Sequence, residues 1–310
     1  MDIKYQCPIC DFEQYCKPLA SMTEKYVAIK CRECQVVSAY PIPSLDELNE
    51  YYSSYQPTQE TPERLSTLVE LHEGILEYLV SKIGHRENLS FLDYGFGVGA
   101  FLKQVAQKGF HAYGAEFSKQ NCEQLENFSR QNNTQINTIQ LSDTPLESLS
   151  GKNFDCITLF QVIEHIINPL ELLSSLSSLQ SSGGILYIEC PNNDALYLKV
   201  KNAIREQVNR GDFFDSLNPP QHLYGFNRHS MQVLLEKAGY IPLEISDYFY
   251  ADGLHQVETL LWYPSFQNLL QNRSAWNFYG VSKSLIGFFE PLASKFLGAG
   301  GGLYAVARKK

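Results

Sequence analysis

Between residues 65 and 191 the sequence alternates short apolar runs with longer segments of helical spacing. The apolar runs predict strands at 90–95, 111–117, 136–142, 154–160 and 183–191. The helical spacing predicts helices at 65–84, 99–109, 118–132 and 169–180, with Gly84, Gly109 and Gly183 near their ends. This alternation predicts an α/β fold with a Rossmann-like, doubly wound and mostly parallel sheet. Helices should cover both faces, and ligands should bind at the carboxyl ends of the strands.

The composition is that of a globular protein. The 310 residues are 44% apolar and 19% charged, and the chain is long enough to bury a substantial core. A formal net charge of −9 disfavours a nucleic-acid partner, since phosphate contacts need clustered Lys and Arg. Neither a transmembrane run nor an apolar signal stretch is seen, so we expect a cytoplasmic protein without a transmembrane segment.

Four cysteines near the N-terminus form two C-x-x-C pairs, Cys7 with Cys10 and Cys31 with Cys34. Four thiolates from two tight turns complete the tetrahedron that structural zinc prefers. Such a site has no open position for water, so this Zn²⁺ should stabilise the fold and take no part in catalysis. The alternatives are unrelated thiols or a redox-active pair. The other cysteines have no paired spacing and are expected to be buried thiols: Cys16, Cys122, Cys156 and Cys190.

The stretch FLDYGFGVGAFL, residues 91–102, places Gly95, Gly97 and Gly99 directly after a predicted strand. This spacing also satisfies the loose glycine pattern of dinucleotide-binding enzymes, so a nicotinamide cofactor is one interpretation. Asp93 would repel a pyrophosphate but would attract a cofactor that carries a sulfonium and an amino group. Glu116, at the end of the next strand, suits two ribose hydroxyls in either case. Asp93 therefore favours the sulfonium cofactor.

Together with FLDYGFGVGAFL and YGAEFS, the stretch FDCITLFQVIEHIINP resembles the motifs of class I S-adenosylmethionine (SAM)-dependent methyltransferases. The likeness is greatest to a bacterial group with "EH" after the fourth strand, and PPQHLYGFNRHSMQVLLEKAGY resembles a further stretch of that group. The cysteine pairs followed by YPIPSLDELNEYYSSY are similar to the start of a subset that carries a zinc ribbon. The resemblance implies a seven-stranded sheet, closed by an antiparallel pair of strands at 240–253 and 300–310.

The resemblance also implies a role for each site residue. Asp93 and the three glycines would surround the methionine part of SAM, and Glu116 would bind its ribose. Gln161 would lie beside the amine and the sulfonium. The adenine would be contacted by Phe117 and by Asp143 or Thr144.

Methyl transfer to a hydroxyl needs a base, and the candidates are His165 and His222. Either histidine could instead serve only to pack its helix or order its loop. In related quinone-pathway O-methyltransferases, an acid at the position of Gln161 and the following Glu-His pair resemble a divalent-metal site. Because that acid is an amide here, we predict no catalytic metal.

The expected organisation is a zinc ribbon at 1–45, a connector with a leading helix at 46–88, and a SAM-binding domain at 89–253 plus 298–310. An aromatic-rich helical insertion at 254–297 would form a cap or a dimer interface, so a homodimer is possible. The expected activity is methylation, on oxygen, of a small molecule or a sugar, including nucleotide-linked sugars, because members of the similar subset often act on sugars. The alternatives are an RNA methyltransferase and a non-catalytic zinc-ribbon scaffold, and a nicotinamide dehydrogenase comes after them.

Overall fold

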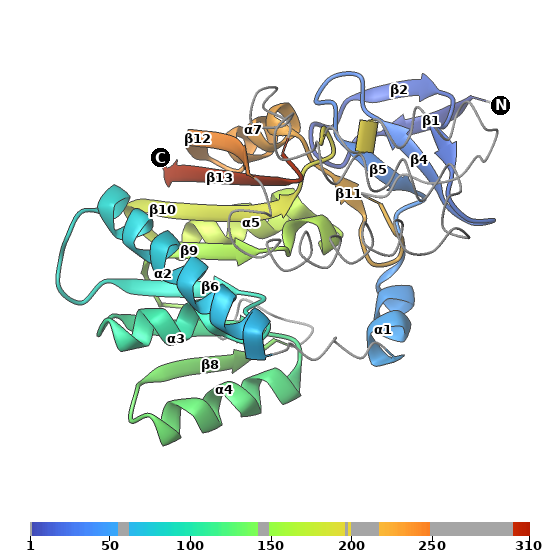
Figure 1. Cartoon of the computed structure of the whole chain (residues 1–310). Helices are drawn as coiled ribbons and strands as arrows, with labels where there is room; N and C mark the ends of the chain where they lie inside the picture. The colour runs from blue at the N-terminus through green and yellow to red at the C-terminus, as the bar shows by residue number, and fades with distance from the viewer. Residues whose placement is uncertain (1, 55–61, 142–148, 196–197, 200–216, 249–299) are drawn as a thin grey trace, which may run out of the picture.

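A computed structural model describes residues 2–54, 62–141, 149–195, 198–199, 217–248 and 300–310 of the chain (Figure 1). The expected insertion at 254–297 and the candidate residue Asp143 lie outside these residues. No helix within the described ranges is both long and apolar enough to cross a membrane.

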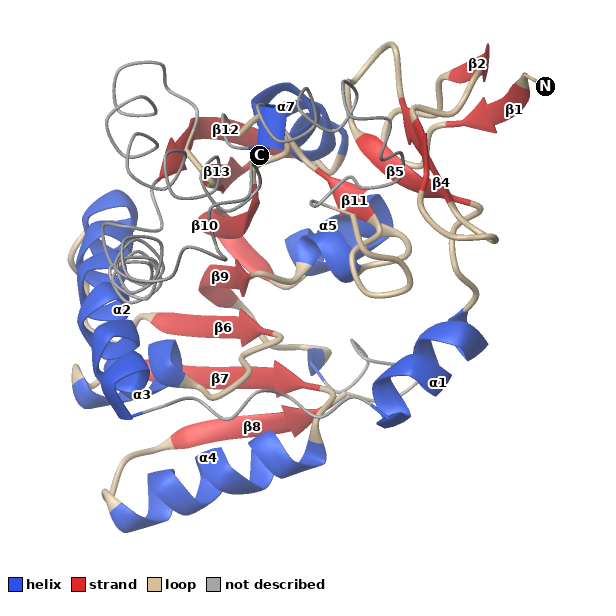
Figure 2. Cartoon of the chain, turned by 45° about the vertical axis from the view of Figure 1, so that its right-hand side comes forward, coloured by secondary structure: helices blue, strands red, loops and turns tan. Residues whose placement is uncertain are grey.

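A seven-stranded sheet forms the centre of the molecule, with the order β12-β13-β10-β9-β6-β7-β8 (Figure 2). Its strands are β6 (Ser90–Tyr94), β7 (His111–Glu116), β8 (Ile136–Gln140), β9 (Phe154–Phe160), β10 (Gln180–Pro191), β12 (Tyr240–Tyr248) and β13 (Gly302–Lys309). Strand β13 is antiparallel to both of its neighbours, and the remaining pairings are parallel. The predicted Rossmann-like, mostly parallel sheet is thus confirmed.

Helices cover both faces of this sheet because each buries one apolar face. The first face carries α2 (Pro62–Ile83), α3 (Ala100–Gln107) and α4 (Lys119–Gln131), whose side chains share a core with Phe91 of β6. The second face carries α5 (Pro169–Ser178) and α7 (Arg228–Lys237), which pack into another core. Figure 1 shows α2 and α3 in front of the sheet and α5 behind it.

The N-terminal module is a small β structure that contacts the second face. A hairpin of β1 (Ile3–Gln6) and β2 (Glu13–Cys16) precedes β3 (Ala20–Ser21), β4 (Val27–Lys30) and β5 (Val37–Tyr40). Its sheet has the order β11-β5-β4-β3, so it includes β11 (Tyr224–Gly225), a strand far along the chain. The connector then forms α1 (Leu45–Ser54).

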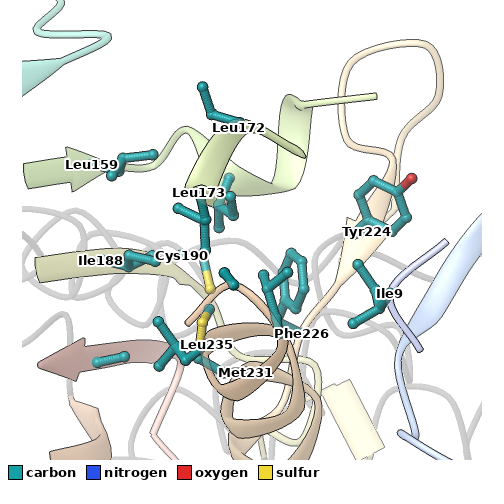
Figure 3. Close-up of a cluster of buried hydrophobic side chains, with 14 of the residues drawn as sticks. Ile9, Leu159, Leu172, Leu173, Ile188, Cys190, Tyr224, Phe226, Met231 and Leu235 are labelled. Carbon is teal, nitrogen blue, oxygen red and sulfur yellow. The ribbon is translucent and has the colours of Figure 1, made fainter. Parts of the chain in front are cut away.

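One hydrophobic core joins this module to the seven-stranded sheet. Cys7, Cys31 and Cys34 belong to the same buried cluster as Phe226, Met231 and Leu235, and the partly buried Cys10 packs against it. Figure 3 shows Ile9, from the first cysteine turn, close to Tyr224 of β11. The module is therefore packed against the larger domain and is not held by a linker alone.

Two of the three glycine positions predicted as helix ends are confirmed. Gly84, with φ of 98°, directly follows α2, and Gly109, with φ of 82°, follows Lys108, the C-cap of α3; at each position a left-handed residue ends the helix. The prediction for Gly183 was wrong, because α5 ends earlier, at Ser178. Gly183, with φ of 74°, instead lies where the β10–β9 pairing shifts register between Gln180 and Ile185, and such a bulge favours glycine.

Candidate cofactor and acceptor site

The predicted cofactor residues meet at one edge of the sheet. In the parallel register, Asp93 of β6 lies opposite Gly114 of β7 on one side and Thr158 of β9 on the other. The three strands therefore end side by side, and the residues that follow them share one edge. This is the edge at which α/β sheets bind ligands.

The glycine loop after β6 takes a conformation that other residues rarely adopt. Gly95 has φ of 74°, and its N–H donates to the Ala115 carbonyl at 2.7 Å. A Cβ on Gly95 would lie 2.6 Å from Val162. Gly97 has φ of 55°, and a Cβ there would meet no atom within 4 Å, so its backbone borders open space. Gly99 is the N-cap of α3, with φ of 70°.

Backbone N–H groups hold Glu116 beside this loop. One carboxylate oxygen accepts from the Gly97 N–H at 2.9 Å, and the other accepts from the Ser118 N–H at 2.9 Å. Each oxygen keeps a second lone pair, so the fixed carboxylate can also accept from two ligand hydroxyls. This is the arrangement that a ribose with two free hydroxyls requires.

Asp93 is a buried carboxylate with one strong partner. Its side chain is 2% exposed, and its Oδ1 accepts from the Thr158 hydroxyl at 2.8 Å. Burial is the main cause that raises the pKa of Asp93 to about 7, with Glu116 and Glu189 adding to it and the Thr158 hydrogen bond opposing it. A bound cation would remove this penalty, because an opposite charge favours the ionised carboxylate.

Gln161 follows β9 in a strained left-handed conformation, with φ of 54°. Its N–H donates to the Glu189 carbonyl at 2.9 Å, and its side chain donates to the Tyr248 hydroxyl at 3.3 Å. Phe117, the candidate for adenine contact, is 55% exposed and leaves its ring open to a ligand. Both side chains therefore lie where the sequence predicted a role, and their roles remain proposals.

The two candidate bases lie against each other. His165 is on a short 3₁₀ helix, η2 (Ile163–His165), together with Glu164. The ring centroids of His165 and His222 are 4.6 Å apart, in an edge-to-face arrangement. His165 Nδ1 lies 2.9 Å from the Gln221 carbonyl, which only accepts, so Nδ1 carries the proton and Nε2 keeps a lone pair. Burial, with a smaller effect of His222, lowers the pKa of His165 to about 4, so the ring is neutral.

Glu164 is 1% exposed, and neither of its carboxylate oxygens has a hydrogen-bond partner among the described residues. Its donor atoms lie within 4.8 Å of those of His165 and His222. One carboxyl group and two imidazoles suit a divalent metal, so the donor set fits such an ion. The prediction of no catalytic metal considered Gln161 but not His222. It stays a prediction, and metal analysis tests it.

The four paired cysteines form a second donor cluster. Their sulfur atoms all lie within 4.8 Å of one another, with 3.5 Å between Cys7 and Cys34 and between Cys10 and Cys31. Four thiolates on one Zn²⁺ would be about 3.8 Å apart, since each Zn–S bond is about 2.3 Å. The cysteines are all free of disulfides, and their geometry fits a tetrahedral Zn²⁺.

Sequence reasoning missed two polar residues at the cofactor edge. Thr158 and Glu189 are buried within apolar strands, and Glu189 accepts from the Tyr187 and Tyr248 hydroxyls. The signal was present in FDCITLF and GGILYIECP, where Thr158 and Glu189 each stand between apolar residues. Buried polar groups of this kind need partners, and here they surround the candidate site.

Replacing Glu116 with glutamine is expected to weaken S-adenosylhomocysteine (SAH) binding by roughly tenfold to a hundredfold. The amide leaves only one oxygen for two backbone donors and two ribose hydroxyls. Calorimetric titration measures the effect. The matched control is Glu123→Gln, which removes an equal charge from an exposed position on α4. Equal affinity in the two variants would contradict the ribose role of Glu116.

The sheet order, the glycine loop and the carboxylate at the second strand end define a Rossmann-like methyltransferase fold. The sequence profile of the family described as "Methyltransferase domain" matches residues 67–245, more than half of the chain. The chain therefore belongs to this family of methyltransferase domains.

Curated relatives and solved structures agree with this membership. Ubiquinone biosynthesis O-methyltransferase of Rickettsia akari is 30% identical over 122 residues, 38% of this chain and 48% of that protein. The protein of the same name from Vibrio vulnificus is 24% identical over 119 residues, 38% and 51% of the two chains. The chain thus matches about half the length of these relatives. Coclaurine N-methyltransferase bound to N-methylheliamine and SAH has a TM-score of 0.52 at 15% identity, covering 82% of this chain and 76% of that one. That likeness shows the fold alone.

Proposed function

We propose that the chain is a SAM-dependent methyltransferase that methylates a hydroxyl group on a small molecule, including free or nucleotide-linked sugars. The main support is the hydrogen bond from the Gly97 N–H to the Glu116 carboxylate, together with the buried Asp93 at the same edge. A ribose and a positively charged amino acid moiety need these groups at this spacing. The name of the Rickettsia and Vibrio relatives supports oxygen as the acceptor atom.

The residues of the chain have three tasks in this proposal. Bound SAM supplies a methyl group already activated on a sulfonium. Asp93, Gln161 and the glycine loop orient the amino acid moiety, and Glu116 fixes the ribose. Orientation of the acceptor oxygen in line with the methyl group contributes roughly 7–11 kcal/mol in favourable cases. His165 takes the acceptor proton at Nε2, since its Nδ1–H is held by the Gln221 carbonyl.

The N-terminal cysteines have a structural role in the same proposal. Cys7, Cys10, Cys31 and Cys34 would hold one Zn²⁺ and so stabilise the module and the shared core. Glu164, His165 and His222 would alternatively hold a divalent cation, which would supply Lewis-acid chemistry; in that case His165 Nε2 would be a metal ligand and would not take the acceptor proton.

Replacing His165 with glutamine is expected to lower kcat by roughly a hundredfold or more, while SAH affinity changes less than threefold. The His222→Gln variant should show a smaller fall in kcat, because His165, the proposed base, remains. Single-turnover methyl transfer from labelled SAM separates this effect from cofactor binding. A kcat within threefold of wild type in His165→Gln would overturn the base assignment.

A further inference from the structure

The segment that carries His222 is built into the sheet of the N-terminal module. Tyr224 and Gly225 of β11 pair with Ser38 and Val37 of β5, and the Ala39 N–H donates to the Leu223 carbonyl at 2.9 Å. On its other side, the Leu223 N–H donates to the Glu164 carbonyl at 2.8 Å. The module therefore reaches the two histidines through a continuous backbone hydrogen-bond network.

Helix α1 extends from the same module toward the same place. Its first turn is anchored by Glu47, whose carboxylate accepts from the Ser44 N–H at 3.0 Å and from the Tyr26 hydroxyl at 2.8 Å. Figures 1 and 2 show α1 on the side of the sheet where the parallel strands end. The cofactor loop and the histidines lie at that same edge.

Two tyrosines of α1 contact the histidine site directly. The Tyr51 hydroxyl donates to the side-chain oxygen of Gln221 at 3.1 Å, and the Tyr52 hydroxyl lies 3.4 Å from His165 Nδ1. The Nδ1–H of His165 is thus shared between the Gln221 carbonyl and the Tyr52 hydroxyl oxygen. The Gln221 carbonyl and the Tyr52 hydroxyl both contact the ring at Nδ1. They leave Nε2 as the atom that takes the proton in the proposed function.

The two tyrosine rings also present an aromatic surface. They pack edge to face with centroids 5.2 Å apart, and Tyr52 is 42% exposed. A tyrosine ring with this exposure can pack against a bound molecule while its hydroxyl contacts a histidine. Sugars and phenols offer the flat apolar faces that such a surface binds.

We propose that Tyr52 is a positioning residue for His165 and that α1, through Tyr51 and Tyr52, forms one wall of the acceptor site. The acceptor would be a ring-bearing alcohol or phenol. This inference rests on the proposed function, and it makes the zinc-ribbon module and the methyltransferase domain two halves of one acceptor site.

The test compares Tyr52→Phe with Tyr15→Phe, which removes a hydroxyl from an exposed tyrosine of the same module. The first readout is a long-range ¹H–¹⁵N spectrum of the histidine rings in the protein without acceptor, with His165 assigned from its loss in His165→Gln. We expect the His165 Nδ1 resonance to move in Tyr52→Phe and to stay unchanged in Tyr15→Phe.

The second readout is steady-state methyl transfer to phenols and sugars. In Tyr52→Phe we expect the acceptor KM to rise about threefold to tenfold while the KM for SAM is unchanged. An unmoved Nδ1 resonance, or an unchanged acceptor KM, would overturn the inference. The spectrum needs no acceptor, so its result stands even if the wild-type protein transfers no methyl group and the proposed function fails.

Discussion

Replacing Asp93 with asparagine is expected to weaken SAH binding at least a hundredfold while making the cofactor-free protein more stable above pH 7. Binding weakens because the ligand's amino group loses its buried counter-charge. Stability rises because the folded pKa of Asp93 is about 7, whereas the unfolded pKa is near 3.8. The folded state therefore opposes ionisation of this carboxyl.

The pH dependence has a definite sign. A carboxyl group whose folded pKa is raised does not change the free energy of unfolding below about pH 4. It lowers that free energy progressively from about pH 4 to pH 7, and by a constant amount above pH 7. A difference of about three pH units corresponds to at most roughly 4 kcal/mol. Asparagine does not titrate, so the gain in unfolding free energy of Asp93→Asn should grow across this window and then level off.

Urea unfolding at pH 5 and pH 8, with calorimetric titration of SAH, measures both effects. The control is Asp155→Asn, because Asp155 lies on the neighbouring strand β9 and accepts from the Ser90 N–H away from the cofactor edge. That variant should lose some stability and keep its SAH affinity. An Asp93→Asn protein that binds SAH as wild type does would contradict the assignment of Asp93 to the cofactor.

The double variant Cys31→Ser, Cys34→Ser is expected to lose its zinc and to unfold the N-terminal module. Structural zinc contributes about 10–16 kcal/mol of apparent binding free energy in small zinc domains, so its loss should exceed the stability of the module. Because β11 belongs to the module's sheet, the His222 segment should lose its position as well. We expect methyl transfer to fall at least a hundredfold, whereas SAH affinity falls much less.

Elemental analysis and hydrogen exchange measure these changes, and Cys16→Ser is the matched control. Cys16 is buried in the same module, accepts from the Gln14 side chain at 3.2 Å and stands outside the cysteine cluster. Wild type and control should each contain one zinc per chain. Full stability and activity in the zinc-free double variant would contradict the structural role. If the wild-type protein holds a second metal ion per chain and the Glu164→Gln variant does not, the prediction of no catalytic metal is wrong.

The sequence predicted the sheet well because its signals are local. An apolar run predicts a strand whichever strands become its neighbours in the sheet. Asp93, Gln161 and Glu116 each lie at or just beyond the end of a strand predicted in this way. Parallel strands bring their carboxyl ends to one edge, so the meeting of these residues followed from the fold class.

The acceptor side depends on contacts that carry no local signal. Strand β11 has two residues and no periodicity, yet it joins the module's sheet. Tyr52 and His165 are 113 positions apart, and only the packing of α1 brings them together. Residues 180 to 184, QSSGG, carry no apolar pattern, so the sequence predicted a strand only from 183; the structure begins β10 at Gln180 and shifts its register before Ile185.

The proposed function depends above all on SAM binding at the edge formed by Asp93, the glycine loop and Glu116. The most direct measurement is a calorimetric titration of the zinc-loaded chain at pH 8, where Asp93 is ionised, with SAH in one experiment and NAD in another. We expect one SAH bound per chain with a dissociation constant in the micromolar range, and no heat with NAD. A folded, zinc-loaded chain that binds NAD, or that binds neither ligand, would show that this edge is not a SAM site.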